Sequence, residues 1–439
     1  MRHPLQWRMI NANTTVLHIN WRESGRSLSA RWRSEAALPP PDIAEIGNDS
    51  LNAEAAWEIL ASGRHLLWRG DWVRVRHLMQ ALSRRADQHF AFSGHLLEAQ
   101  SLPPPLPNPS PARGEELLPQ SPRAGRKADS DGESEPGVAA SAFAQHRQRQ
   151  GAKAALLNRL LVPLNGQYKL PLRRAQDVRL ACRDAWGEPE GEMSIVALRE
   201  LLAVISAHEW RKKGVLIPAA GGRIHPHYGV FSPVRGEYVE LLAQAPLPAD
   251  HTLAFDIGAG TGVLAAVLAQ RGVARVVAVD NAPRALACAR DNVARLGLAS
   301  QIEVIAADLF PAGKAPLIVC NPPWLPAQPS APIEQAIYDP DSRMLRGFLS
   351  GLAAHLPPGG EGWLILSDLA EHLGLRHRQQ LLDWIATAGL AVLGRLDTRP
   401  QHGKASDRND PLHTARAAEI TSLWRLGVAS TIGKKPVNP

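Results

Sequence analysis

From residue 251 onward, short apolar runs alternate with longer stretches in which apolar residues recur at helical spacing. Alternation of this kind predicts parallel strands joined by right-handed crossovers, with helices on both faces. The fold class expected here is α/β, a Rossmann-like, doubly wound sheet of seven strands. The predicted strands are 253–257, 275–279, 302–306, 317–320, 362–366, 390–395 and 419–426, and the predicted helices are 263–270, 283–296, 341–355 and 377–387.

The residues before this sheet have a different pattern, in which helical spacing dominates. Residues 1–100 are predicted to form an N-terminal region that is mainly helical from about residue 51, after a poorly structured start at 1–40. Residues 151–214 are expected to be the helical continuation of this domain, with helices at 154–161, 176–185 and 194–210. The catalytic domain is predicted at 215–430, entered through a hairpin within 221–230 and a helix from about 236.

Residues 101–150 separate the two helical parts and differ from both in composition. Proline, serine, glycine and arginine dominate, and a run of prolines excludes regular structure at its start. We therefore predict a disordered linker or insertion over 101–150.

Composition narrows the class of protein. A chain of 439 residues exceeds what a single core usually serves, so two or more domains are expected. Its net charge of +7 is compatible with a polyanionic partner such as RNA but does not establish one. No membrane span or secretory leader is recognised, so we expect a soluble, cytoplasmic protein without a membrane partner. No metal site is expected, since Cys182, Cys288 and Cys320 are far apart and His225 and His227 lack a third ligand.

A glycine-rich turn follows the first predicted strand of the sheet. Gly258, Gly260 and Gly262 alternate with other residues directly after Asp256. Ligands of open α/β sheets bind beyond the carboxyl ends of the strands, and glycine lets them approach the main chain. Because the dinucleotide fingerprint has the longer spacing G-x-G-x-x-G, this turn favours a methionine and a ribose over a pyrophosphate.

Two acidic residues end the next strands. Asp280 could accept hydrogen bonds from ribose hydroxyls, and Asp308 is suited to an adenine amino group; alternatively, both only cap the turns that follow. The candidate cofactor-binding residues share a place at these strand ends; they are Asp256, Gly258, Ala259, Gly260, Gly262, Asp280, Asn281, Asp308 and Asn321.

The residues after the fourth strand are suited to a planar nitrogen, and they are Asn321, Pro322, Pro323 and Trp324. An amide or exocyclic amine is a poor nucleophile because its lone pair is delocalised, so a site must orient it. The side-chain oxygen of Asn321 and the carbonyl of Pro322 could accept its two N–H bonds, while Trp324 packs on its plane. These four are the candidate catalytic residues, and the alternative is a rigid loop with a core tryptophan. The acids Asp339 and Asp341, further on, could line the substrate mouth; alternatively, Asp341 caps the following helix.

With this motif downstream of the glycine turn, the chain resembles class I S-adenosylmethionine-dependent methyltransferases that carry the small methyltransferase domain, over roughly residues 215–395. In that group an [ND]-P-P-[YFW] motif is shared by protein-glutamine N5-methyltransferases, acting on release factors or a ribosomal protein, and by RNA enzymes that methylate guanine N2 or adenine N6. The resemblance implies S-adenosylmethionine as cofactor, held by the glycine turn and Asp280, with Asn321 and Pro322 holding the target nitrogen.

The leading hypothesis is methylation of a protein glutamine, because a helical N-terminal domain before a hairpin is similar to the arrangement of the release-factor enzymes. The partner would then be a release factor or a ribosomal protein. The second hypothesis is methylation of a base in ribosomal or transfer RNA, for which Trp324 could stack a flipped base. A third is a cofactor-binding scaffold without catalysis. The oligomeric state is left open.

Overall fold

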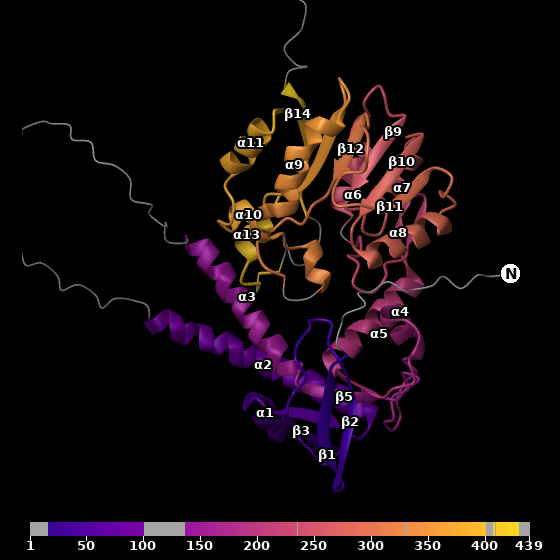
Figure 1. Ribbon diagram of the computed structural model, residues 1–439. Helices are drawn as coiled ribbons and strands as arrows, with labels where there is room; N and C mark the ends of the chain where they lie inside the picture. The colour runs from indigo at the N-terminus through magenta and orange to yellow at the C-terminus, as the bar shows by residue number, and fades with distance from the viewer. Residues whose placement is uncertain are drawn as a thin grey trace, which may run out of the picture.

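The computed structural model describes residues 16–100, 137–234, 236–329, 332–400, 407, 408 and 410–429. Within these ranges the chain forms two large sheets, one from the first half of the sequence and one from the second, and they occupy opposite ends of the molecule (Figure 1). Between them in sequence lies a small antiparallel hairpin of β7 (Val215–Ile217) and β8 (Gly222–Ile224), joined through the 3₁₀ turn η1 (Pro218–Ala220).

The second sheet has seven strands in the spatial order β11-β10-β9-β12-β13-β15-β14. Only β15 runs antiparallel to its neighbours. This arrangement confirms the doubly wound sheet predicted from the apolar runs, which are continuous because the central strands are buried on both faces. The strands are β9 (Leu253–Ile257), β10 (Arg275–Asp280), β11 (Ile302–Ala306), β12 (Leu317–Cys320), β13 (Glu361–Ser367), β14 (Leu390–Thr398) and β15 (Thr421–Val428).

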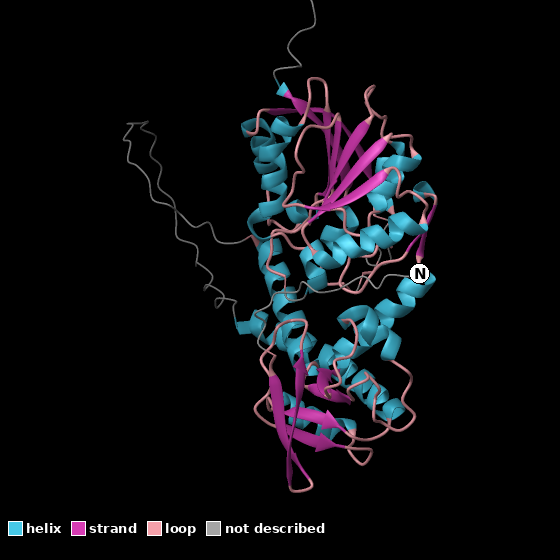
Figure 2. Cartoon of the chain, turned by 45° about the vertical axis from the view of Figure 1, so that its right-hand side comes forward, coloured by secondary structure: helices cyan, strands magenta, loops and turns pink. Residues whose placement is uncertain are grey.

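Helices cover both faces of this sheet and define two cores (Figure 2). Along β9, Ala254 faces one core, whereas Phe255 and Ile257 face the other, as strand alternation requires. The first core is covered by α6 (Glu237–Gln244), α7 (Val263–Gln270) and α8 (Pro283–Arg295), and the second by α9 (Arg343–His355) and α11 (Arg378–Thr387). Short helical segments complete this half: η2 (Pro332–Ala336), η3 (Pro340–Ser342), α10 (Leu369–His372) and α13 (His413–Ala418).

The first half of the chain contains a six-stranded mixed sheet in the order β1-β2-β6-β5-β4-β3. The expectation of an N-terminal domain built mainly of helices was therefore incomplete. Helices do pack on it: α1 (Ala53–Ala61), α2 (Trp72–Gln100), α3 (Val138–Leu157), α4 (Arg179–Trp186) and α5 (Leu198–Lys213). The strands are β1 (His18–Glu23), β2 (Arg26–Arg33), β3 (Ala44–Gly47), β4 (His65–Trp68), β5 (Leu160–Leu164) and β6 (Ser194–Ala197).

Short apolar runs explain why these strands were assigned to helices. Val162 and Val196 pair across β5 and β6, and every residue of both strands is buried. A run of four or five apolar residues beside a helix has no periodicity of its own, so the predicted helices at 154–161 and 194–210 each absorbed part of a strand. Neighbouring strands, rather than local pattern, decide their conformation.

Two other expectations about this half need correction. The poorly structured start predicted for 1–40 is wrong for residues 18–33, which form the β1–β2 hairpin with Ile19 and Trp21 buried; residues 1–15 lie outside the described ranges. Of the predicted linker 101–150, residues 101–136 also lie outside them, whereas 138–150 belong to α3. This part lacks proline and carries Phe143, which is buried against the second half of the chain. The proposed domain boundaries remain predictions.

Candidate functional site

The loops after β9 and β12 lie side by side, although they are far apart in the sequence. The two strands are parallel neighbours, and Ile257 pairs with Cys320, so Gly258 and Asn321 begin adjacent loops. The sheet order reverses between these strands, with β10 and β11 on one side and β13 on the other. This switch point is where open α/β sheets bind ligands. The structure thus brings the predicted glycine turn and the predicted nitrogen-holding motif to one place.

The glycine turn folds back against the end of β10. The N–H groups of Gly258 and Ala259 both donate to the carbonyl of Val279, at 2.9 and 2.8 Å. Gly258 has φ of +75°, and a Cβ at this position would lie 2.6 Å from Cε of Met344 at the start of α9. Glycine is therefore favoured there by the positive φ, whereas the contact with Met344 involves the end of a flexible side chain that could move.

Asp280, at the end of β10, is bound to the glycine turn. Its Oδ2 accepts a hydrogen bond from the N–H of Gly260 at 3.0 Å, and its Oδ1 accepts one from Ala282 at 2.9 Å. The second bond is the turn-capping role considered as the alternative for this residue. Each carboxylate oxygen can accept a further bond, so capping and ligand binding are compatible at Asp280.

Asp256, in β9, is completely buried beneath the glycine turn. Its Oδ2 accepts a hydrogen bond from the N–H of Ala265 at 3.0 Å, whereas no described residue bonds to its Oδ1. The pKa of Asp256 is raised to about 7, mainly by burial; the hydrogen bond from Ala265 opposes this change, and the charge of Asp280 acts in the same direction as burial. A buried acceptor without a partner is costly, so Asp256 is suited to meet a donor from a ligand.

Asn281 and Asp308 lie at the ends of β10 and β11, as predicted, and both are exposed. They belong to loops at the same edge of the sheet as Asp280. Exposed side chains there are available to a ligand that extends from the switch point across β10 and β11.

The nitrogen-holding motif has an internal hydrogen bond. The indole N–H of Trp324 donates to Oδ1 of Asn321 at 2.9 Å. Pro322 is buried, Pro323 is partly buried, and the Trp324 ring packs against the core beneath α9. The bond fixes the orientation of the Asn321 amide, and it leaves one of the two acceptor positions on Oδ1 for another donor.

The loop after the motif is held by Asp339, one of the two acids considered for the substrate mouth. Asp339 accepts hydrogen bonds from the N–H groups of Met344 and Leu345, at 3.0 and 3.1 Å, and so caps α9. Its own N–H donates to the carbonyl of Leu325, directly after the motif. The expectation that Asp341 could cap this helix is wrong, because Asp341 has φ of +55° and is exposed.

Helix α3 supplies contacts to the same loop from the first half of the chain (Figure 1). Arg147 donates from Nη2 to the carbonyl of Gln328 at 2.7 Å and pairs through Nη1 with Glu334 at 3.2 Å. Its guanidinium lies 4.1 Å from the centre of the Tyr338 ring. Sequence reasoning missed Arg147 because it lies within the stretch predicted to be disordered, and no local motif marks it.

A second contact between the two halves lies beside the Asp280 turn. Arg284, in the first turn of α8, binds Glu35 through both nitrogens, at 2.7 and 3.0 Å, and packs on the ring of Tyr228. Glu35 follows β2. The segment that carries Asp280 and Asn281 is therefore attached to the first half of the chain as well as to its own sheet.

The histidine pair considered for a metal is engaged by protein groups. Nδ1 of His225 is hydrogen-bonded to the carbonyl of Arg211 at 2.6 Å, and Nε2 of His227 to Asp291 at 3.0 Å. Among the residues that the structure describes, no group of three or more His, Cys, Asp or Glu side chains could hold a metal ion. None of the helices within the described ranges is long and apolar enough to cross a membrane.

Comparison with known proteins gives the class of this site. The family model of the methyltransferase small domain matches residues 221–373. A release factor glutamine methyltransferase from Cereibacter sphaeroides is 33% identical over 177 residues, which cover 36% of this chain and 61% of that protein. A tRNA1(Val) (adenine(37)-N6)-methyltransferase from Shewanella loihica is 30% identical over 217 residues, 46% of this chain and 86% of that protein. A ribosomal protein L11 methyltransferase from Sorangium cellulosum is 29% identical over 242 residues, which cover 53% of this chain and 64% of that protein.

The sheet order, the glycine turn and these similarities define an S-adenosylmethionine-dependent methyltransferase of class I. More narrowly, the chain belongs to the methyltransferases that carry the small methyltransferase domain. It spans 61% of the length of the release factor methyltransferase from Cereibacter sphaeroides and 47% of the one from Mycolicibacterium smegmatis. The family model lies within the second half of the chain.

Proposed function

We propose that this protein transfers a methyl group from S-adenosylmethionine to a planar nitrogen, and that the acceptor is the side-chain amide of a protein glutamine. The observation that carries the proposal is the position of Asn321. Its amide is oriented by Trp324 and begins the loop next to the glycine turn. An acceptor group at one loop and a cofactor site at the other is the arrangement that methyl transfer needs.

The residues around the switch point fit the cofactor. Oδ1 of Asp256 is a buried acceptor without a partner among the described residues, and Gly258 has a positive φ that favours glycine and leaves the main chain without a Cβ. Asp280 would hold the ribose, with Asn281 and Asp308 further along the same edge. When bound, S-adenosylmethionine supplies an electrophilic methyl group on its sulfonium. The alternation of Gly258, Ala259, Gly260 and Gly262 would leave room for its methionine part.

The motif would orient the acceptor. Oδ1 of Asn321 has one acceptor position free of Trp324, and the carbonyl of Pro322 offers another, so both N–H bonds of an amide could be held. An amide held in this way presents the face of its nitrogen, rather than an edge, to the methyl group. Pro323 would stiffen the loop. Catalysis would come mainly from proximity and alignment.

Glutamine is favoured over a base by two observations. The first curated relatives, at 33% and 41% identity, are release factor glutamine methyltransferases. In addition, the Trp324 ring is tied to Asn321 and packed against the core, so it is less available as a platform for a flipped base. The helical N-terminal domain that first suggested a protein acceptor no longer supports it, since that half contains a six-stranded sheet.

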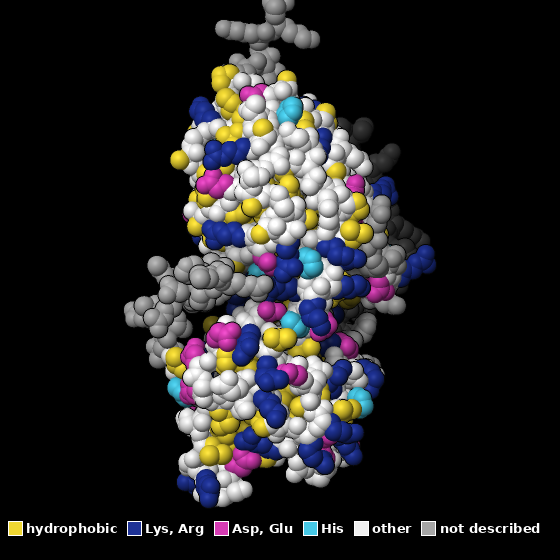
Figure 3. Space-filling view, turned by 90° about the vertical axis from the view of Figure 1, so that its right-hand side faces the viewer, with side chains coloured by type: hydrophobic (Ala, Val, Ile, Leu, Met, Phe, Trp, Pro, Cys, Tyr) yellow, Lys and Arg dark blue, Asp and Glu magenta, His cyan; other side chains and the backbone are white. Residues whose placement is uncertain are grey.

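Methylation of a base in RNA is the second candidate. It is supported by the tRNA methyltransferase from Shewanella loihica, because this chain covers 86% of that relative. Against it, basic and acidic side chains are interspersed on the face shown in Figure 3, rather than separated into one continuous basic surface.

The two acceptors can be separated by one experiment. The purified protein is incubated with labelled S-adenosylmethionine and lysate from cells that lack it, and the labelled fraction is treated with protease or with RNase. Label released by protease supports glutamine, and analysis of the acid hydrolysate for methylamine then tests for an amide. Label released by RNase refutes the protein acceptor. The Asn321→Ala variant serves as the control for transfer by this site.

A further inference from the structure

Arg376 is a buried arginine whose hydrogen bonds are incomplete. It lies between α10 and α11, and only 3% of its surface is exposed. No described residue accepts a hydrogen bond from its Nε or its Nη2, and both atoms are buried. A guanidinium removed from water without an anion is strongly unfavourable. This residue therefore has two donors and a positive charge available for an anionic group.

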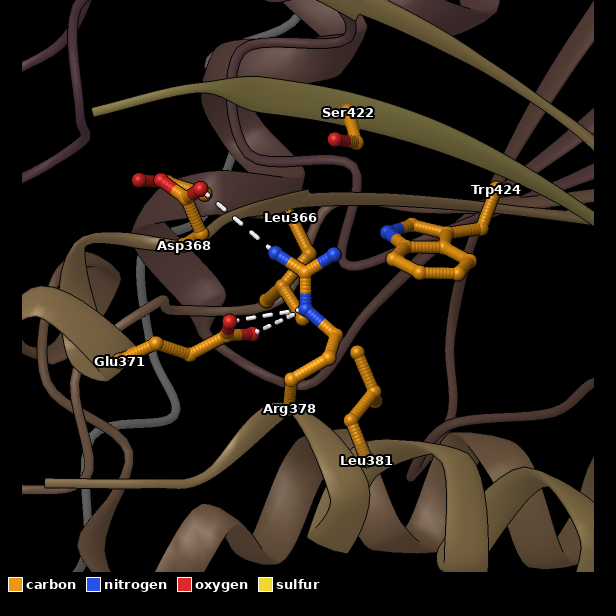
Figure 4. A pocket seen from close by; sticks show the side chains of 8 residues that line it. Leu366, Asp368, Glu371, Arg378, Leu381, Ser422 and Trp424 are labelled. Atoms are coloured by element: carbon orange, nitrogen blue, oxygen red, sulfur yellow. Dashed lines mark hydrogen bonds and ion pairs between the residues drawn. The ribbon is translucent and has the colours of Figure 1, made fainter. Parts of the chain in front are cut away.

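The nearby carboxylates are already engaged by other residues. Figure 4 shows Arg378, two residues further on, between Glu371 and Asp368: its Nε donates to both oxygens of Glu371 at 2.8 Å, and its Nη2 lies 3.5 Å from Asp368. Asp339 is the cap of α9. Burial lowers the pKa of the Arg376 guanidinium, with Glu371 and Asp339 acting in the opposite direction at longer range. The pocket drawn in Figure 4 is thus filled by Arg378, whereas Arg376 forms no such pair.

A second arginine with a free donor faces the same stretch of chain. Arg416, on α13, pairs with Asp410 through Nη1 at 3.1 Å, but its Nε is buried and has no partner among the described residues. Helices α10 and α13 pack together with Leu325 in one apolar cluster. Arg416 acts electrostatically on Tyr338, and Arg376 on Asp339. Leu375, next to Arg376, and Ala415, next to Arg416, both pack in the apolar cluster that contains Leu325 and Tyr338, so the two arginines adjoin the same cluster beside the nitrogen-holding loop.

We propose that Arg376 and Arg416 form an anion subsite, and that its ligand is a side-chain carboxylate of the acceptor protein close to the methylated glutamine. The planar fork of an arginine matches a carboxylate, which a pair of N–H donors binds well. A carboxylate is favoured over an RNA phosphate because the unpartnered donor atoms of Arg376 and Arg416 are buried, whereas phosphates of a nucleic-acid backbone are usually held by exposed residues. The identity of the ligand rests on the proposed function, but binding of an anion does not.

Anion binding can be measured on the full-length protein with acetate as the probe. Thermal unfolding is followed in sodium acetate, sodium phosphate and sodium chloride at equal ionic strength. We expect acetate to raise Tm relative to chloride in the wild type, and this rise to be absent in Arg376→Met. Arg378→Met is the matched control: it removes a neighbouring, fully paired arginine, so it should lower Tm in all salts but keep the response to acetate. Arg416→Met should reduce the response, and it replaces Arg376→Met if that variant does not fold.

Each result has a definite meaning. A rise in Tm with phosphate and not with acetate would assign the subsite to a nucleic acid and overturn the carboxylate. Equal Tm in all three salts, or a response to acetate that survives in both Arg376→Met and Arg416→Met, would overturn the subsite itself.

A kinetic measurement separates this proposal from the proposed function. With a protein acceptor from the lysate, acetate should raise the acceptor KM at unchanged kcat in the wild type and have no such effect in Arg376→Met. Unchanged acceptor KM would show that the anion does not compete with the acceptor. Absence of any methyl transfer, together with a normal Tm response, would refute the function while leaving an anion site.

Discussion

The amide of Asn321 is the residue on which the proposed chemistry depends most. Its Oδ1 already accepts the indole N–H of Trp324, and only one acceptor position remains. The two residues therefore act as a pair, with Trp324 fixing the orientation and Asn321 making the contact. Under the proposed function, Asp280 would contact the cofactor while also accepting the N–H of Gly260, and Asp256 would do so through its buried, unpartnered Oδ1.

Replacing Asn321 with alanine should lower kcat by roughly 10²-fold or more, because the acceptor nitrogen loses its alignment. The Kd for S-adenosylmethionine should change little, since Asn321 lies at the edge of that site. Turnover and calorimetric cofactor binding test both statements. Trp324→Phe is the matched variant, which keeps the ring but loses the N–H bond, so its loss of kcat should be smaller. A variant with weak cofactor binding and normal kcat would reverse the assignment.

Replacing Asp280 with alanine should raise the Kd for S-adenosylmethionine about tenfold or more, because a ribose partner and the bond to Gly260 are lost together. Asp280→Asn provides a comparison, since its amide nitrogen would face the N–H of Gly260 or Ala282. Calorimetric titration measures the affinities. Affinity equal to that of the wild type in both variants would rule out Asp280 as a cofactor ligand.

Asp256 should make stability depend on pH. Its folded pKa, about 7, is raised above the ordinary value of 3.8, so the folded state holds a proton that the unfolded state has lost between these values. The free energy of unfolding should therefore fall as pH rises from about 4 to 7, by at most roughly 4 kcal/mol, and then level off. Asp256→Asn should remove the part of this fall that Asp256 contributes, and a smaller fall due to the raised pKa of Glu200 should remain. Chemical denaturation of both proteins from pH 4.5 to 8 tests it, and parallel curves would contradict it.

At the scale of elements, α3 is the helix that connects the two halves at the nitrogen-holding loop. Phe143 enters the apolar cluster that contains Leu325, and Arg147 binds the loop at three points. Glu334 and Gln328 lie within or just before η2. The conformation of the nitrogen-holding loop therefore depends on α3, which lies outside the residues 221–373 that match the family model.

Replacing Phe143 with alanine should destabilise the protein by about 3 kcal/mol, because a buried aromatic ring is lost from a packed cluster. Chemical denaturation of the variant and the wild type measures this difference.

Arg147→Ala should have a smaller effect on stability, but it should raise the acceptor KM or lower kcat while the cofactor Kd stays constant. Arg147→Lys keeps the charge without the fork and should restore activity only in part. Unaltered acceptor kinetics in Arg147→Ala would show that α3 does not position the loop.

At the scale of the whole molecule, the two halves are joined by α3 and by the pair of Glu35 and Arg284. The partly buried carboxylate of Glu200 accepts a hydrogen bond from the N–H of Glu35 at 3.2 Å. The pKa of Glu200 is raised to about 7, mainly by desolvation, and the charge of Glu35 acts in the same direction. The positive charge of Arg284 therefore offsets the negative charges of Glu35 and Glu200 from the first half of the chain. This interaction lies next to the turn that contains Asp280.

The Arg284→Gln variant should be less stable than Glu35→Gln, because it leaves two acidic groups together without their cation. A double-mutant cycle with both replacements should give a coupling of about 1–3 kcal/mol, measured by chemical denaturation at pH 8. Glu190 and Arg31 form an exposed pair in the first half and serve as the control, with coupling below about 1 kcal/mol. Equal couplings for the two pairs would mean that the contact between halves contributes no more than a surface ion pair.

Sequence alone predicted the second half of the molecule far better than the first. The strands from Leu253 to Cys320 were located almost to the residue, because each is an uninterrupted apolar run between helices. The nitrogen-holding motif and the glycine turn were also recognised from the sequence, because each consists of a few consecutive residues. Their contact could be anticipated from the topology of parallel sheets.

What sequence could not provide depends on distant partners. Leu160–Leu164 is a strand because β4 and β6 flank it, not because of its own pattern. Arg147 contacts the nitrogen-holding loop only because α3 packs against that loop. Arg376 looks like one of several basic residues in the sequence, and its burial without a partner is a property of the folded molecule.

The contact of α3 with the acceptor loop has a consequence for how such an enzyme can diverge. The residues proposed for cofactor and methyl transfer lie within 221–373, whereas contacts that hold the loop after Trp324 come from residues 138–157. Changes in α3 can therefore alter which acceptor is chosen while the transfer chemistry is inherited intact. Relatives that share the motif need not share a substrate, and a hybrid that exchanges only this helix would be the natural place to look for altered selectivity.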